Sequence, residues 1–162
     1  MKTIALIEPP HDLKKYEEWK SQWLDVDSIG IANYISECCH PEDFLICSQL
    51  LIPSFIEVEN SILIKERYQE ENFLAWKKYF SGEMPKVEKM LNNITMYDVF
   101  LHTGNDVSNV IFEQICNMMK ISWGLILKEL FPCRQFIIEV YLSTQDDGPS
   151  ITFYQKNDIV NN

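Results

Sequence analysis

The stretch that decides the fold runs from Asp106 to Leu130 and reads DVSNVIFEQICNMMKISWGLILKEL. Its apolar residues recur at three- and four-residue spacing and cover much of a helical circumference. One polar stripe remains, formed by Glu113, Gln114, Asn117 and Lys120. Thr103-Gly104-Asn105-Asp106 resembles a capping box at its start, and Pro132 follows its end. The pattern predicts a long, central and mostly buried helix over about 106–130.

Two further stretches predict antiparallel hairpins. Arg134–Leu142 (RQFIIEVYL) alternates apolar residues to one face, and Ile151–Tyr154 returns after the turn at 146–149. Phe55–Lys65 (FIEVENSILIK) has β-branched residues on both sides of a short polar break, where Asn60 tolerates a left-handed conformation. Together these hairpins predict a small antiparallel sheet packed on the central helix.

The rest of the chain is predicted to be mainly helical. Helices are expected to begin at Asp12, Ser28, Pro41, Glu70 and Pro85. Lys2–Ile7 is expected to be a strand that ends at Pro9-Pro10. No linker or internal repeat is visible, so the sequence predicts one helix-rich α+β domain over residues 1–156 and a frayed tail at 157–162.

Composition and charge exclude several classes of protein. The 162 residues are 46% hydrophobic, which is enough for a core that needs no metal or disulfide, and the five cysteines are expected to be free thiols. No run of 18 apolar residues occurs, and the apolar stretch Ile4–Ile7 is too short for a secretion signal, so a cytoplasmic location is expected. The net charge of −10 repels nucleic acid and anionic lipid, so neither is an expected partner.

The negative charge is unevenly spread. Residues 21–64 contain no lysine or arginine. The acidic residues of this stretch are Asp25, Asp27, Glu37, Glu42, Asp43, Glu57 and Glu59. A second acidic group follows at Glu139, Asp146 and Asp147. Two interpretations remain open at this point: the acidic side chains keep the surface soluble, or they form a docking face for a cationic protein.

Two groups of potential metal ligands lack the spacing that a metal site requires. The first group is Cys38, Cys39, His40 and Cys47. Structural zinc sites pair their ligands two to four residues apart in two separate clusters, which this group does not. The second group, Asp98, His102 and Asp106, recurs every four residues, but Thr103-Gly104-Asn105 interrupts the helix on which they would align. We therefore expect no metal and no cofactor.

No signature of nucleophilic or phosphate chemistry is present either. The chain lacks a Gly-x-Ser-x-Gly elbow, and its five glycines are scattered singly rather than gathered in a phosphate-binding loop. No catalytic residue is assigned, and the protein is not expected to be an enzyme. Any two of the 24 acidic residues meeting in a cleft would still allow two-carboxylate hydrolysis, so this possibility stays open.

What remains is a small, acidic, aromatic-rich chain, with segments such as FIEVE at 55–59, ILIKE at 62–66 and DGPSITFYQ at 147–155. This profile resembles the immunity proteins of bacterial toxin–immunity pairs, including those of contact-dependent inhibition. The resemblance implies an inhibitor that occludes the active site of a cationic, nuclease-like toxin. The residues expected to bind this partner are Asp25, Asp27, Glu42, Asp43, Glu57, Glu59, Tyr141, Asp146, Asp147 and Tyr154.

Two alternatives belong to other classes. An enzyme with an unrecognised site of carboxylates and one histidine, such as His102, would show a deep pocket with convergent polar groups. A subunit or scaffold of a larger assembly would show a large exposed apolar patch and a stable homo-oligomer. The sequence itself does not give the oligomeric state.

Overall fold

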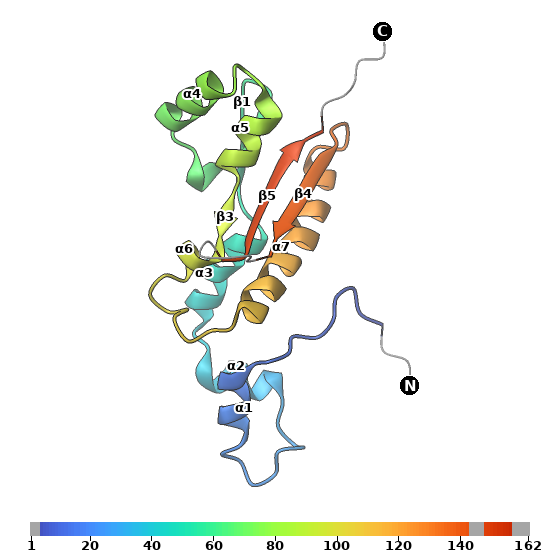
Figure 1. Ribbon diagram of the computed structural model, residues 1–162. Coiled ribbons are helices and arrows are strands. Elements are labelled where there is room, and N and C mark those ends of the chain that lie inside the picture. Colours follow the sequence, from blue (N-terminus) through green and yellow to red (C-terminus); the bar gives the residue numbers. More distant parts are fainter. Residues whose placement is uncertain (1–3, 143–147, 157–162) are drawn as a thin grey trace. The chain divides into compact units, whose positions relative to one another are not determined.

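The computed structural model describes residues 4–142 and 148–156 (Figure 1). Its contacts divide the chain into two compact units, an N-terminal unit, Met1–Gln49, and a C-terminal unit, Leu50–Asn162. The fold is helix-rich α+β with small antiparallel sheets, as predicted from the sequence. The expected single domain over 1–156 stays a prediction, and the expected frayed tail at 157–162 lies outside the described residues.

The N-terminal unit is built from short helices. They are α1 (Lys14–Lys20), α2 (Ile31–Cys38) and the greater part of α3 (Pro41–Leu51). Four aromatic rings join α1 and the turn after it to α2, with centroids 5.2–5.9 Å apart: Tyr16, Trp19, Trp23 and Tyr34. None of the described side chains before residue 50 is fully buried, so this unit has an aromatic cluster rather than a closed core.

Some predicted starts were wrong in this unit. Ile4–Ile7 forms no strand, because no described strand lies beside it to take its backbone hydrogen bonds. Helix α2 begins three residues after the predicted Ser28 cap, since the Asn33 side chain accepts the N–H of Gly30 at 3.0 Å. The Ser28 hydroxyl instead donates to the Asp25 carbonyl. Helix α3 begins at Pro41, as predicted.

The first hairpin of the C-terminal unit confirms the prediction for 55–65. Strand β1 (Phe55–Val58) pairs antiparallel with β2 (Ser61–Ile64), and a short 3₁₀ turn (Lys65–Arg67) follows. The two turn residues, Glu59 and Asn60, have φ values of 48° and 68°. Both central residues of a tight hairpin turn adopt this left-handed conformation, because it matches the twist of the flanking strands.

The second sheet has three antiparallel strands with β5 in the centre. Its order is β3 (Ile94–Thr95), β5 (Ser150–Gln155) and β4 (Phe136–Tyr141), so the C-terminal hairpin also forms as predicted. Helices α4 (Glu70–Tyr79) and α5 (Met84–Leu91) lie between β2 and β3 in sequence, and the short α6 (Met96–Val99) follows β3. Helix α7 (Asn109–Leu130) runs alongside β4 and β5 (Figure 1).

The core of the C-terminal unit lies between α7 and the strands. Helix α7 contributes one fully buried stripe: Phe112, Cys116, Met119, Trp123 and Leu127. The stripe packs with Ile62 and Ile64 of β2 and with Ile151 and Phe153 of β5. The predicted long central helix is therefore confirmed, but the expectation that it is mostly buried is wrong, because only this stripe is fully buried and the other residues of α7 are partly buried or exposed. It begins at Asn109 after Ser108 rather than near Asp106, because residues 103–107 form turns that include a bond from Gly104 N–H to Phe100 O at 2.8 Å.

Two buried polar side chains join the two sheets: Glu88 of α5, and Asn92, which directly follows the last residue of α5. Glu88 accepts the backbone N–H of Ile62 at 2.7 Å and that of Gln155 at 2.6 Å. Asn92 accepts the N–H of Ile64 at 3.0 Å and donates to the carbonyls of Ile62 and Phe153 at 2.9 and 3.2 Å. Neither side chain is exposed. Here side chains supply the hydrogen bonds that a strand between β2 and β5 would otherwise make.

Candidate functional site

The acidic residues proposed to bind a partner fall into two structural settings. Asp25 and Asp27 lie in the turn that follows α1, and Glu42 and Asp43 form the first turn of α3. All four belong to the N-terminal unit, are exposed and have no ion-pair partner among the described residues. Their charge is therefore uncompensated and is open to a cationic ligand.

Glu57 and Glu59 are in the other setting, because cations of the same unit already neutralise them. Arg134 donates to Glu57 at 2.6 Å and also to the carbonyl of Asn60 at 3.2 Å. Lys77 of α4 pairs with Glu59. These two carboxylates hold the tip of the β1–β2 hairpin in place, so they offer less free charge to a partner than Glu42 or Asp43.

Tyr141 and Tyr154 meet on one face of the C-terminal hairpin, opposite its apolar face, as the alternation predicts. Both hydroxyls donate to the carboxylate of Glu139, Tyr154 at 2.8 Å. Lys89 of α5 lies 2.6 Å from the same carboxylate, and its Nζ is 5.4 and 5.3 Å from the two ring centroids. We call these four residues the Lys89–Glu139 cluster. Asp146 and Asp147, which were expected beside it, lie outside the described residues.

The charges of the Lys89–Glu139 cluster stabilise one another. The Lys89 ammonium, helped by the Tyr141 hydroxyl, holds the pKa of Glu139 at about 2, well below its ordinary value. The same contact raises the pKa of Lys89. Burial is the first cause of the raised pKa of Tyr141, and the bond to Glu139 is the first cause for Tyr154. At neutral pH the cluster is a closed ion pair in which no group is poised to take or give a proton.

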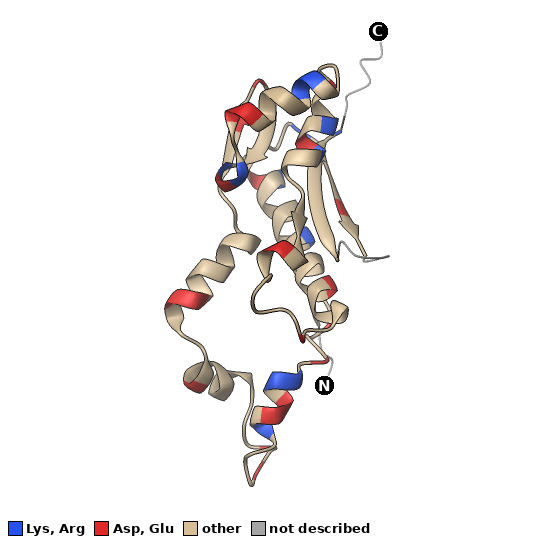
Figure 2. Ribbon diagram, turned by 60° about the vertical axis from the view of Figure 1, so that its left-hand side comes forward, with Lys and Arg blue, Asp and Glu red and all other residues tan. Residues whose placement is uncertain are grey.

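Large apolar side chains accompany the free acids of the N-terminal unit. Ile31 and Ile35 are exposed on α2, and Phe44, Leu45 and Ile46 are exposed on α3, with 70% of the Phe44 surface accessible. Residues 21–49 contain no lysine or arginine, and Figure 2 shows α3 without a basic residue beside its acidic first turn. The acidic first turn of α3 is thus followed directly by exposed apolar residues, and α2 adds two more.

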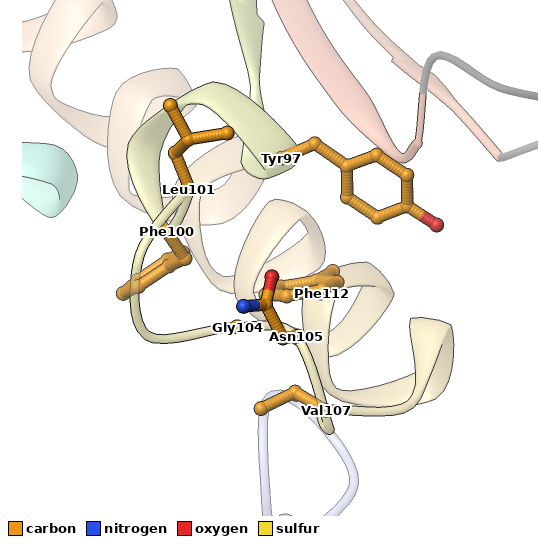
Figure 3. A pocket seen from close by; sticks show the side chains of 7 residues that line it. All are labelled: Tyr97, Phe100, Leu101, Gly104, Asn105, Val107 and Phe112. Atoms are coloured by element: carbon orange, nitrogen blue, oxygen red, sulfur yellow. The ribbon is translucent and has the colours of Figure 1, made fainter.

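The C-terminal unit has a pocket of about 320 Å³ beside the start of α7 (Figure 3). Its lining residues are Tyr97, Phe100, Leu101, Gly104, Asn105, Val107 and Phe112. The Tyr97 hydroxyl points away from the other lining side chains and donates to Asn109 at 2.8 Å. No histidine, carboxylate or cysteine lines this pocket, so it lacks the convergent polar groups of a catalytic site.

The described cysteines, histidines and carboxylates do not assemble into a metal site. No group of three such side chains close enough to hold an ion occurs within 4–142 and 148–156. Cys38, Cys39 and Cys47 are exposed in the N-terminal unit. Cys116 is fully buried, and burial raises the pKa of its thiol to about 12, so it is a core residue and not a nucleophile.

The sequence did not single out Glu88, Lys89, Asn92 or Arg134 in any functional or structural role. The sequence does hold one clue, for Glu88 and Asn92. These residues are four apart, and each directly follows an apolar residue, Val87 or Leu91, so they lie on the helical side next to apolar neighbours. The partners of all four residues lie far away in the sequence, where local patterns give no information.

No protein-family model, curated protein or solved structure matches this chain. The functional reading therefore depends on the residues themselves. Of the described helices, α7 is the one long and apolar enough to cross a membrane, yet its buried stripe forms the core of the C-terminal unit.

Proposed function

We propose that this protein is an acidic, protein-binding inhibitor that acts in the cytoplasm, and that it binds its partner through α2 and α3. The observation that carries the proposal is the composition of 21–49: five acidic residues, no basic residue, and five large exposed apolar side chains on two helices. A surface of this kind attracts a partner that has cationic groups around an apolar patch.

The free charge supports α2 and α3 over the rest of the chain as the binding surface. Glu57, Glu59 and Glu139 are each within an ion pair, whereas Glu42 and Asp43 form no ion pair with any residue that the structure describes. Uncompensated charge steers association, because its field extends into solvent and is not cancelled by a neighbouring cation. The exposed Phe44 beside these acids supplies the apolar anchor that most protein interfaces contain.

The resemblance to immunity proteins indicates which class of partner to expect. An immunity protein neutralises its cognate toxin, and a nuclease toxin carries a basic cleft for its nucleic acid substrate. An acidic inhibitor that occupies such a cleft competes directly with the substrate's phosphates. We propose a toxin of this class as the partner.

The test compares two matched charge reversals in a pull-down from the native host lysate. Glu42→Lys with Asp43→Lys reverses the first turn of α3. Glu70→Lys with Glu71→Lys reverses the first turn of α4, where the two acids are also exposed and free of ion pairs among the described residues. Both variants change the net charge equally, so a difference between them reports position and not total charge.

The proposal expects one dominant basic protein that binds the unmodified chain and the α4 variant at low salt. Its capture should weaken with rising salt and fall sharply in the α3 variant. Equal loss in both variants would mean that binding follows net charge alone. Undiminished binding of the α3 variant would show that α3 is not the binding surface, and a partner that is not cationic would refute the inhibitor reading.

A further inference from the structure

Strand β4 has one edge without a strand beside it. In the described part of the chain, β4 pairs with β5 alone and forms the end of the sheet. Lys156 N–H donates to the Gln135 carbonyl at 2.8 Å, which sets the alternation of the ladder. Because hydrogen-bonded pairs alternate along an antiparallel ladder, Phe136, Ile138 and Val140 direct their N–H and carbonyl groups away from β5.

Two other strand edges of the C-terminal unit, the outer edge of β2 and the far side of β5, are satisfied. Glu88 and Asn92 take the free groups of Ile62 and Ile64 on β2. On the far side of β5, β3 pairs with Ile151, and the same two side chains bond Phe153 and Gln155. No described side chain or strand bonds to the outer edge of β4, which at six residues is longer than the four-residue edge strand β1 of the other sheet.

This edge also lacks the usual protection against a further strand. Natural edge strands are commonly short or carry proline, lysine or a bulge. β4 has six residues, FIIEVY, contains neither proline nor lysine, and keeps a regular register with β5 throughout. Its single charged residue, Glu139, is neutralised by Lys89 on the face of the sheet and not at the edge.

We propose that the free edge of β4 pairs antiparallel with β4 of a second copy of this chain, so that two three-stranded sheets become one of six strands. With the two-fold axis at Ile138, that residue lies opposite its own counterpart, and Phe136 lies opposite Val140 of the second copy. These three pairs exchange two hydrogen bonds each, which gives six.

The side chains support the second copy as the occupant. In this register the pairs on the α7 side of the sheet are entirely apolar, and cross-strand pairs of aromatic or β-branched residues stabilise a sheet. On the other face Glu139 lies opposite Ile137 of the second copy, so no acid opposes an acid. The outward-directed N–H and carbonyl groups lie at the same alternate residues in both copies, so each strand can supply the hydrogen-bond partners that the other lacks.

The size of the contact sets the strength of the dimer. A stable dimer buries roughly 800 Å² on each partner, and pairing through one six-residue edge buries less. The net charge of −10 on each copy adds repulsion, which salt screens. We therefore expect association that grows with protein concentration and with salt. The partner binding proposed above weakens with salt, so the two proposals succeed or fail separately.

The first test is sedimentation equilibrium of the full chain alone, over a concentration series at moderate and high salt. The average mass should rise from 19.1 kDa toward twice that value. Val140→Pro removes an outward N–H and thus two of the six bonds, while Val140→Ala removes the same side chain but keeps the N–H. Dimerisation should be lost or strongly reduced in the proline variant and retained in the alanine variant.

Amide hydrogen exchange of the unmodified chain decides the question if the proline variant does not fold. Exchange at Phe136, Ile138 and Val140 should slow several-fold as concentration rises. Ile137, Glu139 and Tyr141 already bond to β5, so their exchange should stay slow at every concentration. A constant mass of 19.1 kDa with unprotected amides at the three outward positions would overturn the proposal, as would equal dimerisation of the two variants.

Discussion

Replacing Asn92 with leucine tests whether this one side chain holds the two sheets together. Leucine has a similar size but makes no hydrogen bond, so three backbone groups lose their partner: the N–H of Ile64 and the carbonyls of Ile62 and Phe153. All three bonds lie in the interior, and Asn92 itself is not exposed, so water cannot replace it without opening the core. The substitution thus removes polar contacts and leaves their partners buried.

The expected magnitude follows from the number of orphaned groups. Each buried backbone group left without a partner costs about 1–3 kcal/mol, so Asn92→Leu should lower the free energy of unfolding by about 3–9 kcal/mol. A domain of ordinary stability has about 5–15 kcal/mol in total, so the variant should be marginally folded or unfolded at room temperature. Urea unfolding followed by far-ultraviolet circular dichroism and tryptophan fluorescence measures the change.

Asn93→Leu is the matched control. Asn93 is the next residue, only partly buried, and its side chain makes no hydrogen bond to any described residue. The same chemical change there should alter the free energy of unfolding by about 0.5 kcal/mol or less. If Asn92→Leu costs no more than Asn93→Leu, then Asn92 does not join the sheets in the way that we describe.

Three further predictions concern titratable groups. Burial raises the pKa of Glu88, so the stability that this carboxyl contributes is complete below its unfolded pKa of about 4.3 and is lost as the pH rises through the raised value. Urea unfolding over a pH series that starts at the unfolded pKa and rises from there should therefore show a fall in stability that Glu88→Gln lacks, and parallel curves for the two proteins would contradict this. Lys89 lowers the pKa of Glu139, so the carboxyl carbon of Glu139 should titrate by NMR with a midpoint of about 2. The stability that this ion pair contributes should be lost as the pH falls from about 4.3, the unfolded pKa, toward that value. An ordinary midpoint would mean that the Lys89–Glu139 cluster does not form. Four exposed cysteines should react with a thiol reagent at neutral pH while buried Cys116 reacts only in denaturant, and five fast thiols would place Cys116 outside the core.

Local sequence patterns were sufficient to predict those helices and hairpins whose signal lies within the element or directly beside it. The hairpin at 55–65 follows from β-branched residues around Asn60, and the left-handed φ values at the turn agree with that choice. The long helix follows from its periodicity and from Pro132. Helix α3 begins at Pro41 because proline fits the first turn, where its missing N–H has no partner to lose.

Interactions between distant residues explain what the sequence did not predict. Glu88 resembles a solvent-facing residue between Val87 and Lys89, and its burial depends on Ile62 and Gln155, which lie 26 and 67 residues away. Glu57 appeared as a free acid because Arg134, its partner, is 77 residues away. From the sequence alone, acidic residues that are free to bind a partner could thus be distinguished only in part from those held in structural ion pairs.

A helix whose side chains complete two sheets also determines the order in which the protein folds and opens. The hairpin ends at Ile64 and β5 begins at Ser150, so the bonds made by Glu88 and Asn92 close loops of very different length. Nonlocal closures of this kind slow folding, since chain entropy is lost before the contacts form. Once they have formed, α5 cannot leave without releasing both strands, so β2, α5 and β5 should open as one cooperative unit rather than fray separately.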